Sequence, residues 1–104
     1  MPSPAHTPQP PYYAVIFTSV RTEGDNGYAE MAKRMLDLAS AQPGFLGFET
    51  ARQEIGISVS YWSTQEAITA WKENFAHQEA QARAKDWYGV FRVRVCRVER
   101  EYGF

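Results

Sequence analysis

The order of extended and helical patterns constrains this chain more than any other feature of it. Four runs of β-branched and aromatic residues are typical of strands, and amphipathic stretches separate the first from the second and the third from the fourth. The predicted strands are 12–20, 45–52, 57–62 and 90–98, and the predicted helices are 28–39 and 64–76, with a further helical or irregular piece at 78–85. This β-α-β-β-α-β order predicts an α+β, ferredoxin-like fold: a four-stranded antiparallel sheet with both helices on one face.

The first eleven residues form a separate segment. They hold five of the six prolines of the chain, and a segment of this composition buries too little apolar surface to offset the entropy lost when it becomes ordered. We therefore predict a flexible tail over 1–11, in which His6 is solvated. The remaining residues, 12–104, are expected to form one domain around one core.

Composition excludes several classes of partner. A net charge of −1 gives no electrostatic reason to expect nucleic acid or an anionic membrane, and no apolar run approaches the ~20 residues of a membrane span. The single cysteine, Cys96, lies in an alternating strand pattern, where it is expected to be a small buried hydrophobe rather than a reactive thiol. We expect a cytoplasmic protein with no metal and no cofactor.

Aromatic residues and a histidine are concentrated where the third predicted strand runs into the second predicted helix. Ser63 and Glu66 have the spacing of a capping box, so the strand is expected to enter the helix almost without a loop. The stretch 58–81 holds five candidate site residues: Tyr61, Trp62, Trp71, Asn74 and His77. We expect the functional site at this junction.

Two predicted strands carry polar residues among apolar ones. The mixed sets are Ser58, Ser60 and Trp62 in one strand and Arg92, Arg94 and Cys96 in the other. If both sets lie on the sheet face that the helices leave open, a second copy of the sheet packed over that face encloses a cavity of aromatic and polar groups, which suits a ligand. The alternative is that Arg92 and Arg94 point to water from an exposed sheet.

The same junction carries a family resemblance. The residues concerned are Tyr61-Trp62-Ser63, Glu66-Ala67-Ile68, Trp71, Asn74 and His77, preceded by the run from Pro43 to Glu49. Over about residues 12–99 the chain resembles the antibiotic biosynthesis monooxygenase (ABM) family. The resemblance implies a homodimer whose two sheets form a dimeric α+β barrel, with a pocket between each sheet and its helices. Members include cofactor-independent oxygenases of polycyclic aromatic compounds, haem-degrading monooxygenases and small isomerases.

The haem-degrading branch of this family fits the chain poorly. That branch uses an asparagine in the first strand, a tryptophan that Trp71 matches, and an axial histidine about ten positions after it. The first predicted strand, 12–20, has no asparagine, and Gln81 stands at the tenth position. His77 is only six positions on, and on an unbroken helix it lies on a stripe with Asn74, away from the core. We expect no haem complex.

The leading hypothesis is a cofactor-independent monooxygenase of a small aromatic or polycyclic substrate. The expected roles are His77 as the base, Trp71 and Trp62 as walls, Arg92 as stabiliser of a developing oxyanion, and Tyr61, Asn74 and Arg94 as substrate contacts. Structural roles stay open for three of these residues: Trp71 as a helix anchor, Trp62 at a dimer seam and His77 at a solvated helix end. The alternative functions are a non-catalytic small-molecule or haem-binding dimeric module, or an interaction protein whose open sheet serves only to dimerise.

Overall fold

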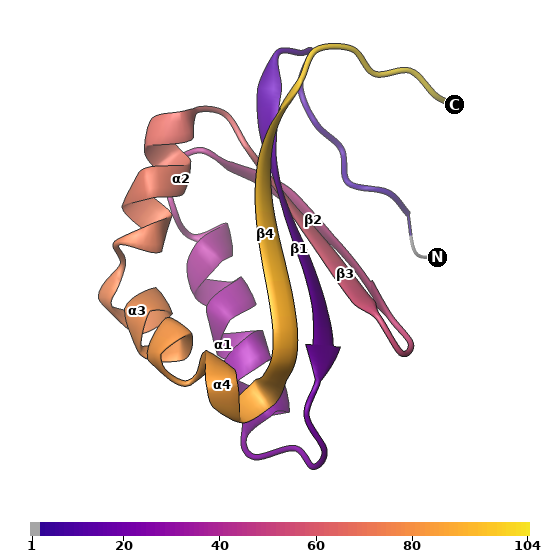
Figure 1. The fold of residues 1–104 in the computed structure, drawn as a ribbon. Helices are drawn as coiled ribbons and strands as arrows, with labels where there is room; N and C mark the ends of the chain where they lie inside the picture. The colour runs from indigo at the N-terminus through magenta and orange to yellow at the C-terminus, as the bar shows by residue number, and fades with distance from the viewer. Residues whose placement is uncertain (1–2) are drawn as a thin grey trace.

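A four-stranded antiparallel sheet with helices on one face makes up the chain in a computed structural model, which describes residues 3–104 without the side chains of residues 75 and 76 (Figure 1). The strands are β1 (Tyr12–Arg21), β2 (Phe45–Arg52), β3 (Gly56–Trp62) and β4 (Tyr88–Val98). The helices are α1 (Tyr28–Ser40), α2 (Gln65–Lys72), α3 (Phe75–Ala82) and α4 (Ala84–Trp87). The strand order β2-β3-β1-β4 confirms the predicted ferredoxin-like fold.

The register of the ladders assigns each side chain to a face, because opposite residues of antiparallel strands point the same way. On β1, Phe17 is opposite Ser58 of β3 and Val93 of β4. The Phe17 ring contacts that of Tyr88, which in turn contacts Tyr28 of α1, so this face packs against the helices. We call it the helix face, and the opposite one, which carries the alternate residues of each strand, the open face.

The two mixed sets of residues lie on opposite faces, so the expectation that they share the open face is wrong. Thr18 is opposite Arg92 and Ile16 is opposite Arg94, which puts both arginines on the open face with Cys96. The other set, Ser58, Ser60 and Trp62, faces the helices. Each strand offers two regular alternate sets, and only the register between strands decides which set meets the helices.

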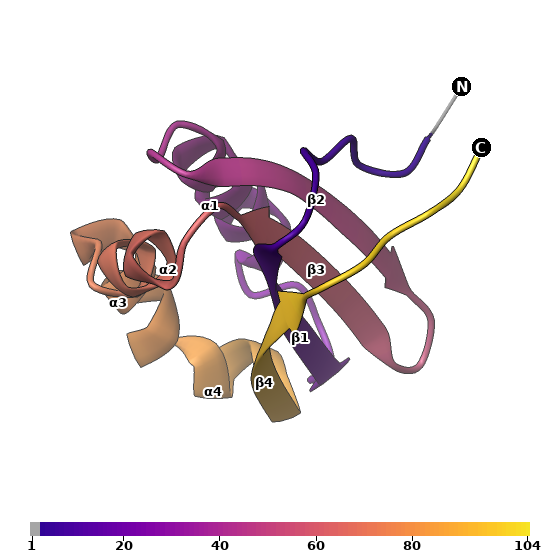
Figure 2. The same cartoon turned by 90° about the horizontal axis from the view of Figure 1, so that it is seen from above.

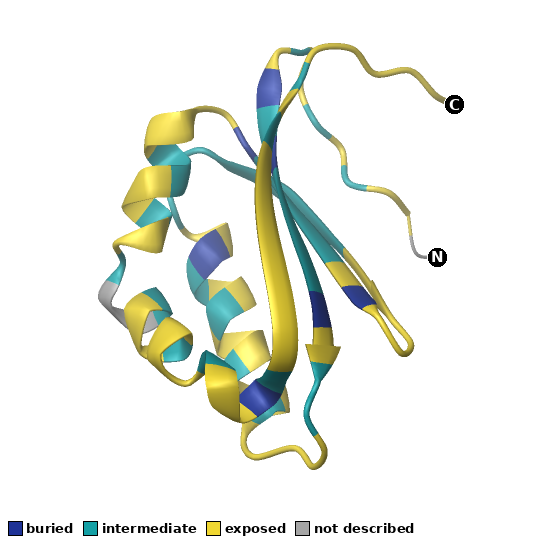
Figure 3. Ribbon diagram, viewed as in Figure 1, coloured by how far each residue is buried: buried dark blue, intermediate teal, exposed yellow. Residues whose placement is uncertain are grey.

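Tryptophans fill the layer between sheet and helices. Trp62 has none of its surface exposed and Trp87 only 3%. The Phe45 ring meets Trp62 edge-on with 5.4 Å between centroids, and Tyr28 contacts Trp87 in the same manner at 6.2 Å. By contrast, much of β4 is exposed, as Figure 3 shows in yellow. No helix within residues 3–104 is both long and apolar enough to span a membrane.

A side-chain oxygen accepts from one N–H group in the first turn of α1 and from one in the first turn of α2. For α1, the Asp25 carboxylate accepts from the Ala29 N–H at 3.1 Å. For α2, the capping residue is Thr64, whose Oγ1 accepts from the Ala67 N–H at 3.0 Å. The capping box predicted at Ser63 is therefore wrong by one residue.

Both terminal segments lie on the open-face side of the sheet, away from the helices (Figure 2). The Ala5 N–H donates to Oε2 of Glu49 at 2.9 Å. Nearer β1, Thr7 Oγ1 is 2.9 Å from the Tyr12 hydroxyl, which is 3.1 Å from a carboxylate oxygen of Glu101. Residues 3–11 therefore have contacts with the sheet that their proline-rich composition did not predict.

Candidate functional site

Three rings are stacked at the predicted junction, one from each of three successive elements. Trp62 at the end of β3 lies nearly parallel to Trp71 of α2, with 6.4 Å between ring centroids. His77 of α3 lies on Trp71 at 4.6 Å and 18° between ring planes. Trp62 anchors the stack, since it is fully buried and its Nε1–H donates to Ser60 Oγ at 2.9 Å. The structure thus brings together three of the seven predicted site residues.

A break in the helix brings His77 to this position. The sequence suggested an unbroken helix over 64–76, but α2 ends at Lys72 and α3 begins at Phe75. At the break, the Asn74 N–H donates to the Trp71 carbonyl at 3.0 Å, and the Gln78 N–H donates to the Asn74 carbonyl at 2.9 Å. The chain therefore turns, and His77 returns over Trp71 instead of lying on the outer stripe of one long helix.

The contacts of His77 favour its neutral form. Burial lowers its pKa below the ordinary value, and the charge of Lys72 acts in the same direction, while the hydrogen bond to Trp71 opposes both. His77 Nδ1 is 3.2 Å from the Trp71 carbonyl oxygen, which can only accept, so Nδ1 carries the proton. The neutral ring then has its lone pair on Nε2, as a general base requires.

An apolar strip on β4 lies on the same sheet face as this stack. Its members are Phe91, Val93 and Val95, which alternate along the strand and are 48%, 47% and 52% exposed. Phe91 stacks on Phe17 of β1 at 5.5 Å. Because the helices leave this strip half-uncovered, the helix face offers apolar surface to a planar ligand.

Tyr88 is a further polar group on the helix face that the sequence did not single out. Its ring is 5.1 Å from that of Phe17 and 6.2 Å from that of Phe91. Burial, followed by a hydrogen bond with Tyr28, raises the pKa of Tyr88 above its ordinary value. The phenol therefore stays protonated at neutral pH. The signal in the sequence was the Trp87-Tyr88-Gly89 interruption before the last strand.

Three of the predicted site residues lie on the other side of the sheet. Tyr61, Arg92 and Arg94 are on the open face, whereas His77 packs on the helix face. The arginines border an open-face hollow of about 200 Å³. The sheet therefore separates Arg92 from His77, and one chain cannot present both to one small molecule. Their predicted grouping in a single site is wrong for this reason.

Tyr61 belongs to a hydrogen-bonded pair on the open face. Its hydroxyl donates to Oε1 of Glu49 at 2.6 Å, and its ring meets Tyr12 edge-on at 5.9 Å. Burial, with the adjacent Glu49 carboxylate, raises the pKa of Tyr61 to about 12. Tyr61 is therefore a neutral donor already bound to a carboxylate. Asn74, by contrast, lies half-buried at the α2–α3 break, next to the stack.

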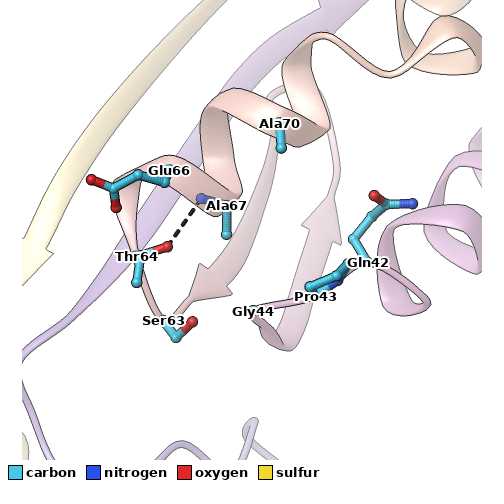
Figure 4. Close-up of a pocket in the computed structure, with 8 residues that line it drawn as sticks. All are labelled: Gln42, Pro43, Gly44, Ser63, Thr64, Glu66, Ala67 and Ala70. Atoms are coloured by element: carbon cyan, nitrogen blue, oxygen red, sulfur yellow. Dashed lines mark hydrogen bonds between the residues drawn. The ribbon is translucent and has the colours of Figure 1, made fainter.

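A separate hollow of about 340 Å³ lies between the turn before β2 and the start of α2 (Figure 4). None of the seven predicted site residues lines it. Its walls include Pro43, Gly44, Ser63 and Ala67, from the runs that carry the family resemblance. A Cβ at Gly44 would be 2.7 Å from the Ala67 Cβ, so the two segments meet without a side chain between them. Within residues 3–104, no three His, Cys, Asp or Glu side chains converge as a metal site requires.

Comparison with known proteins agrees with this architecture. A family model described as antibiotic biosynthesis monooxygenase matches residues 11–83. Uncharacterized protein YqjZ of Bacillus subtilis (strain 168) is 50% identical over 98 residues, which cover 91% of this chain and 86% of YqjZ.

Solved structures give the same picture of the fold. SnoaB, a cofactor-independent oxygenase from Streptomyces nogalater, superposes with a TM-score of 0.71 at 8% identity, covering 90% of this chain and 97% of SnoaB. A putative antibiotic biosynthesis monooxygenase from Chloroflexus aurantiacus superposes with a TM-score of 0.67 at 18% identity. The superposition covers 88% of this chain and 97% of the Chloroflexus chain. At these identities the likeness establishes the fold alone.

Proposed function

This chain belongs to the antibiotic biosynthesis monooxygenase family, and on that premise we propose that it oxidises a small electron-rich aromatic compound with O₂ and no cofactor. The observation that carries the proposal is the state of His77. Its Nδ1–H is held by the Trp71 carbonyl, and burial keeps the ring neutral, so Nε2 is the basic atom. A base of this kind is the one protein group that such chemistry needs.

The proposed reaction starts with removal of a proton from a phenol, an enol or an activated ring CH₂ group by His77 Nε2. The resulting anion passes one electron to O₂, and the radical pair combines into a peroxide. For a ring CH₂ group, loss of water from the peroxide leaves a carbonyl, so one oxygen atom enters the product and the other enters water. In this proposal the protein contributes the base and the apolar surface of the helix face against which the substrate ring lies.

The surroundings of His77 support an aromatic substrate. The imidazole ends a stack of flat rings, Trp62 and Trp71, and the half-exposed strip of Phe91, Val93 and Val95 lies on the same sheet face. Flat π-surfaces and aliphatic side chains bind planar rings through dispersion and loss of apolar surface to water. Tyr88, which stays protonated because its pKa is raised, adds a phenol hydroxyl to the same sheet face.

The second candidate is binding of the same class of molecule without turnover. One observation favours it: the partner of His77 Nδ1 is a neutral carbonyl, and Lys72 disfavours a second positive charge. An imidazolium formed at His77 therefore gains less stabilisation than one held by a carboxylate.

The proposal includes a homodimer joined through the open face. Apolar side chains at one end of that face are exposed: Val20 by 41%, Ile57 by 47% and Val90 by 62%. Packing against a second copy would remove them from water. Light scattering should give twice 11.9 kDa, and a monomer mass at all concentrations would contradict this part. A cytoplasmic location stays part of the proposal.

Two measurements on one panel of anthrones and quinols test the function. Quenching of tryptophan fluorescence reports binding, and O₂ uptake with product analysis reports turnover. The parent should do both, whereas His77→Ala should bind and lose turnover by ~10²–10⁴; His6→Ala is the control. Binding without uptake by the parent supports the second candidate, and absence of both refutes the proposal. A stoichiometric haemin complex that His77→Ala abolishes would contradict the expectation of no haem binding.

A further inference from the structure

The first residues of the chain are held on the open face of the sheet at more than one point. We call residues 3–11 the strap. The Ala5 N–H donates to Oε2 of Glu49 at 2.9 Å. The methyl group of Ala5 lies where Gly47 leaves room for it, since a Cβ at position 47 would be 2.8 Å from the Ala5 Cβ. Thr7 Oγ1 is 2.9 Å from the Tyr12 hydroxyl. The strap thus contacts both β2 and β1.

Two carboxylates secure the strap from opposite sides. Glu49 accepts from Tyr61 through Oε1 and from the strap through Oε2. Glu101, in the segment after β4, has one oxygen 3.1 Å from both Thr7 Oγ1 and the Tyr12 hydroxyl. The strap is therefore joined to the rest of the chain on both sides of the central strand.

The strap divides the open face into a covered end and an uncovered end. Tyr12 and Ala14, at the strap end of β1, are only 4% and 5% exposed although no helix covers this face. At the other end, Val20, Ile57 and Val90 are between 41% and 62% exposed. The Tyr12 hydroxyl contacts both terminal segments of the chain, through Thr7 and Glu101, and Figure 2 shows where these segments lie.

The area of the face limits what can share it with the strap. Four strands about 4.8 Å apart and about 30 Å long have a projected area of roughly 600 Å². A stable interface buries about 800 Å² per partner, so a second copy needs the whole face and its margins. With the strap in place, the uncovered end alone is too small.

We propose that the strap is an autoinhibitory clasp that competes with a second copy of the chain for the open face. Dimerisation then requires the strap to leave Gly47 and Glu49. This inference rests on the homodimer of the proposed function. It concerns the sheet face opposite His77, so aromatic binding at the helix face is an independent readout.

The first test compares monomer–dimer dissociation constants by analytical ultracentrifugation. Ala5→Leu places a larger side chain where Gly47 leaves room only for a methyl group, and deletion of residues 1–10 removes all of the strap except Pro11. Because a seated strap reduces the competent fraction, both changes should tighten the dimer roughly tenfold or more. His6→Ala, a change at an exposed neighbour in the strap, should leave the constant unchanged. An unchanged or weaker dimer in both strap variants would overturn the proposal.

The second test locks the strap. In a Cys96→Ser background, Ala5→Cys with Gly47→Cys should form a disulfide within one chain after a shift of about 1 Å. The oxidised protein should be monomeric and should dimerise after reduction. As a control, a chain with Ala5→Cys alone is mixed with a chain with Gly47→Cys alone, and no covalent dimer should form. A covalent dimer would show that the strap of one chain lies on the sheet of its partner, which would refute the proposed autoinhibition. If the chain that lacks residues 1–10 is monomeric at every concentration, the result contradicts the proposed homodimer itself.

Discussion

The imidazole of His77 lies on the indole of Trp71 with 4.6 Å between ring centroids, and its Nδ1 is 3.2 Å from the carbonyl oxygen of the same residue. One residue thus fixes both the position and the tautomer of the histidine. The ring contact depends on the Trp71 side chain, but the hydrogen bond comes from its backbone. The tautomer of His77 is therefore set by the backbone at the α2–α3 break and not by a neighbouring side chain.

Stability should depend on pH through His77. Burial lowers its pKa, so the unfolded chain takes up this proton at a higher pH than the folded one. The contribution of His77 to the free energy of unfolding is then complete above about pH 6.5 and is lost as pH falls through the folded pKa. Urea titrations of the parent and His77→Gln between about pH 7.5 and pH 5 should show this loss only in the parent. His6→Gln should behave like the parent, and identical profiles for all three proteins would contradict the burial of His77.

Arg92 should have no part in chemistry at the helix face. Arg92→Met keeps the apolar stem and removes the charge, and it should leave aromatic binding and turnover at the parent level because the sheet separates Arg92 from His77. Its neighbour Val93 points to the helix face, and Val93→Thr should weaken binding severalfold. Fluorescence titration of both variants checks this, and the reverse ranking would place the ligand on the open face.

Capping of α2 should depend on Thr64 and not on Ser63. Thr64→Ala removes the acceptor of the Ala67 N–H and should lower the free energy of unfolding by about 1 kcal/mol. Ser63→Ala is the matched control one residue earlier, with an expected change within ~0.5 kcal/mol. Urea unfolding midpoints of the two variants separate these cases. An equal cost would mean that both hydroxyls cap the helix.

Two glycines with similar positive φ angles should differ in their tolerance of alanine. Gly44 has a φ of 86° and Gly27 has a φ of 82°, so both substitutions strain the backbone. At Gly27 a Cβ meets nothing within 4 Å, whereas at Gly44 it meets Ala67 at 2.7 Å. Gly44→Ala should therefore cost about 1–3 kcal/mol more than Gly27→Ala. Thermal melts provide the measurement, and equal costs would show that α2 moves aside freely.

The fold was predictable because its signals are local. Alternation in 12–20 and helical spacing in 28–39 are properties of neighbouring residues, and their order along the chain suffices for the ferredoxin-like arrangement. The register is not local. Whether Ser58 or Ile57 meets the helices depends on its pairing with β1, some forty residues earlier, and alternation alone gives both choices equal weight.

The site was predictable in part for the same reason. Trp62, Trp71 and His77 were found because they are close in sequence, but the turn that joins them was not. Glu73 and Asn74 end α2 without a glycine or proline, which are the strongest signals of a break. The contacts of the strap were not predicted because Ala5 packs against Gly47, where the absence of a side chain leaves room for it. The composition of the segment gives no signal of such a fit.

The position of β1 between β3 and β4 has a consequence for how the protein is made. Of the four strands, β1 is synthesised first and β4 last, so one hydrogen-bonding edge of β1 stays unpaired until β4 has left the ribosome. Pairing of β1 with β4, which are far apart in the sequence, is costly in entropy, and folding should be slower than in a helical protein of equal length. A chain that stops before β4 should expose that edge and associate with others like it.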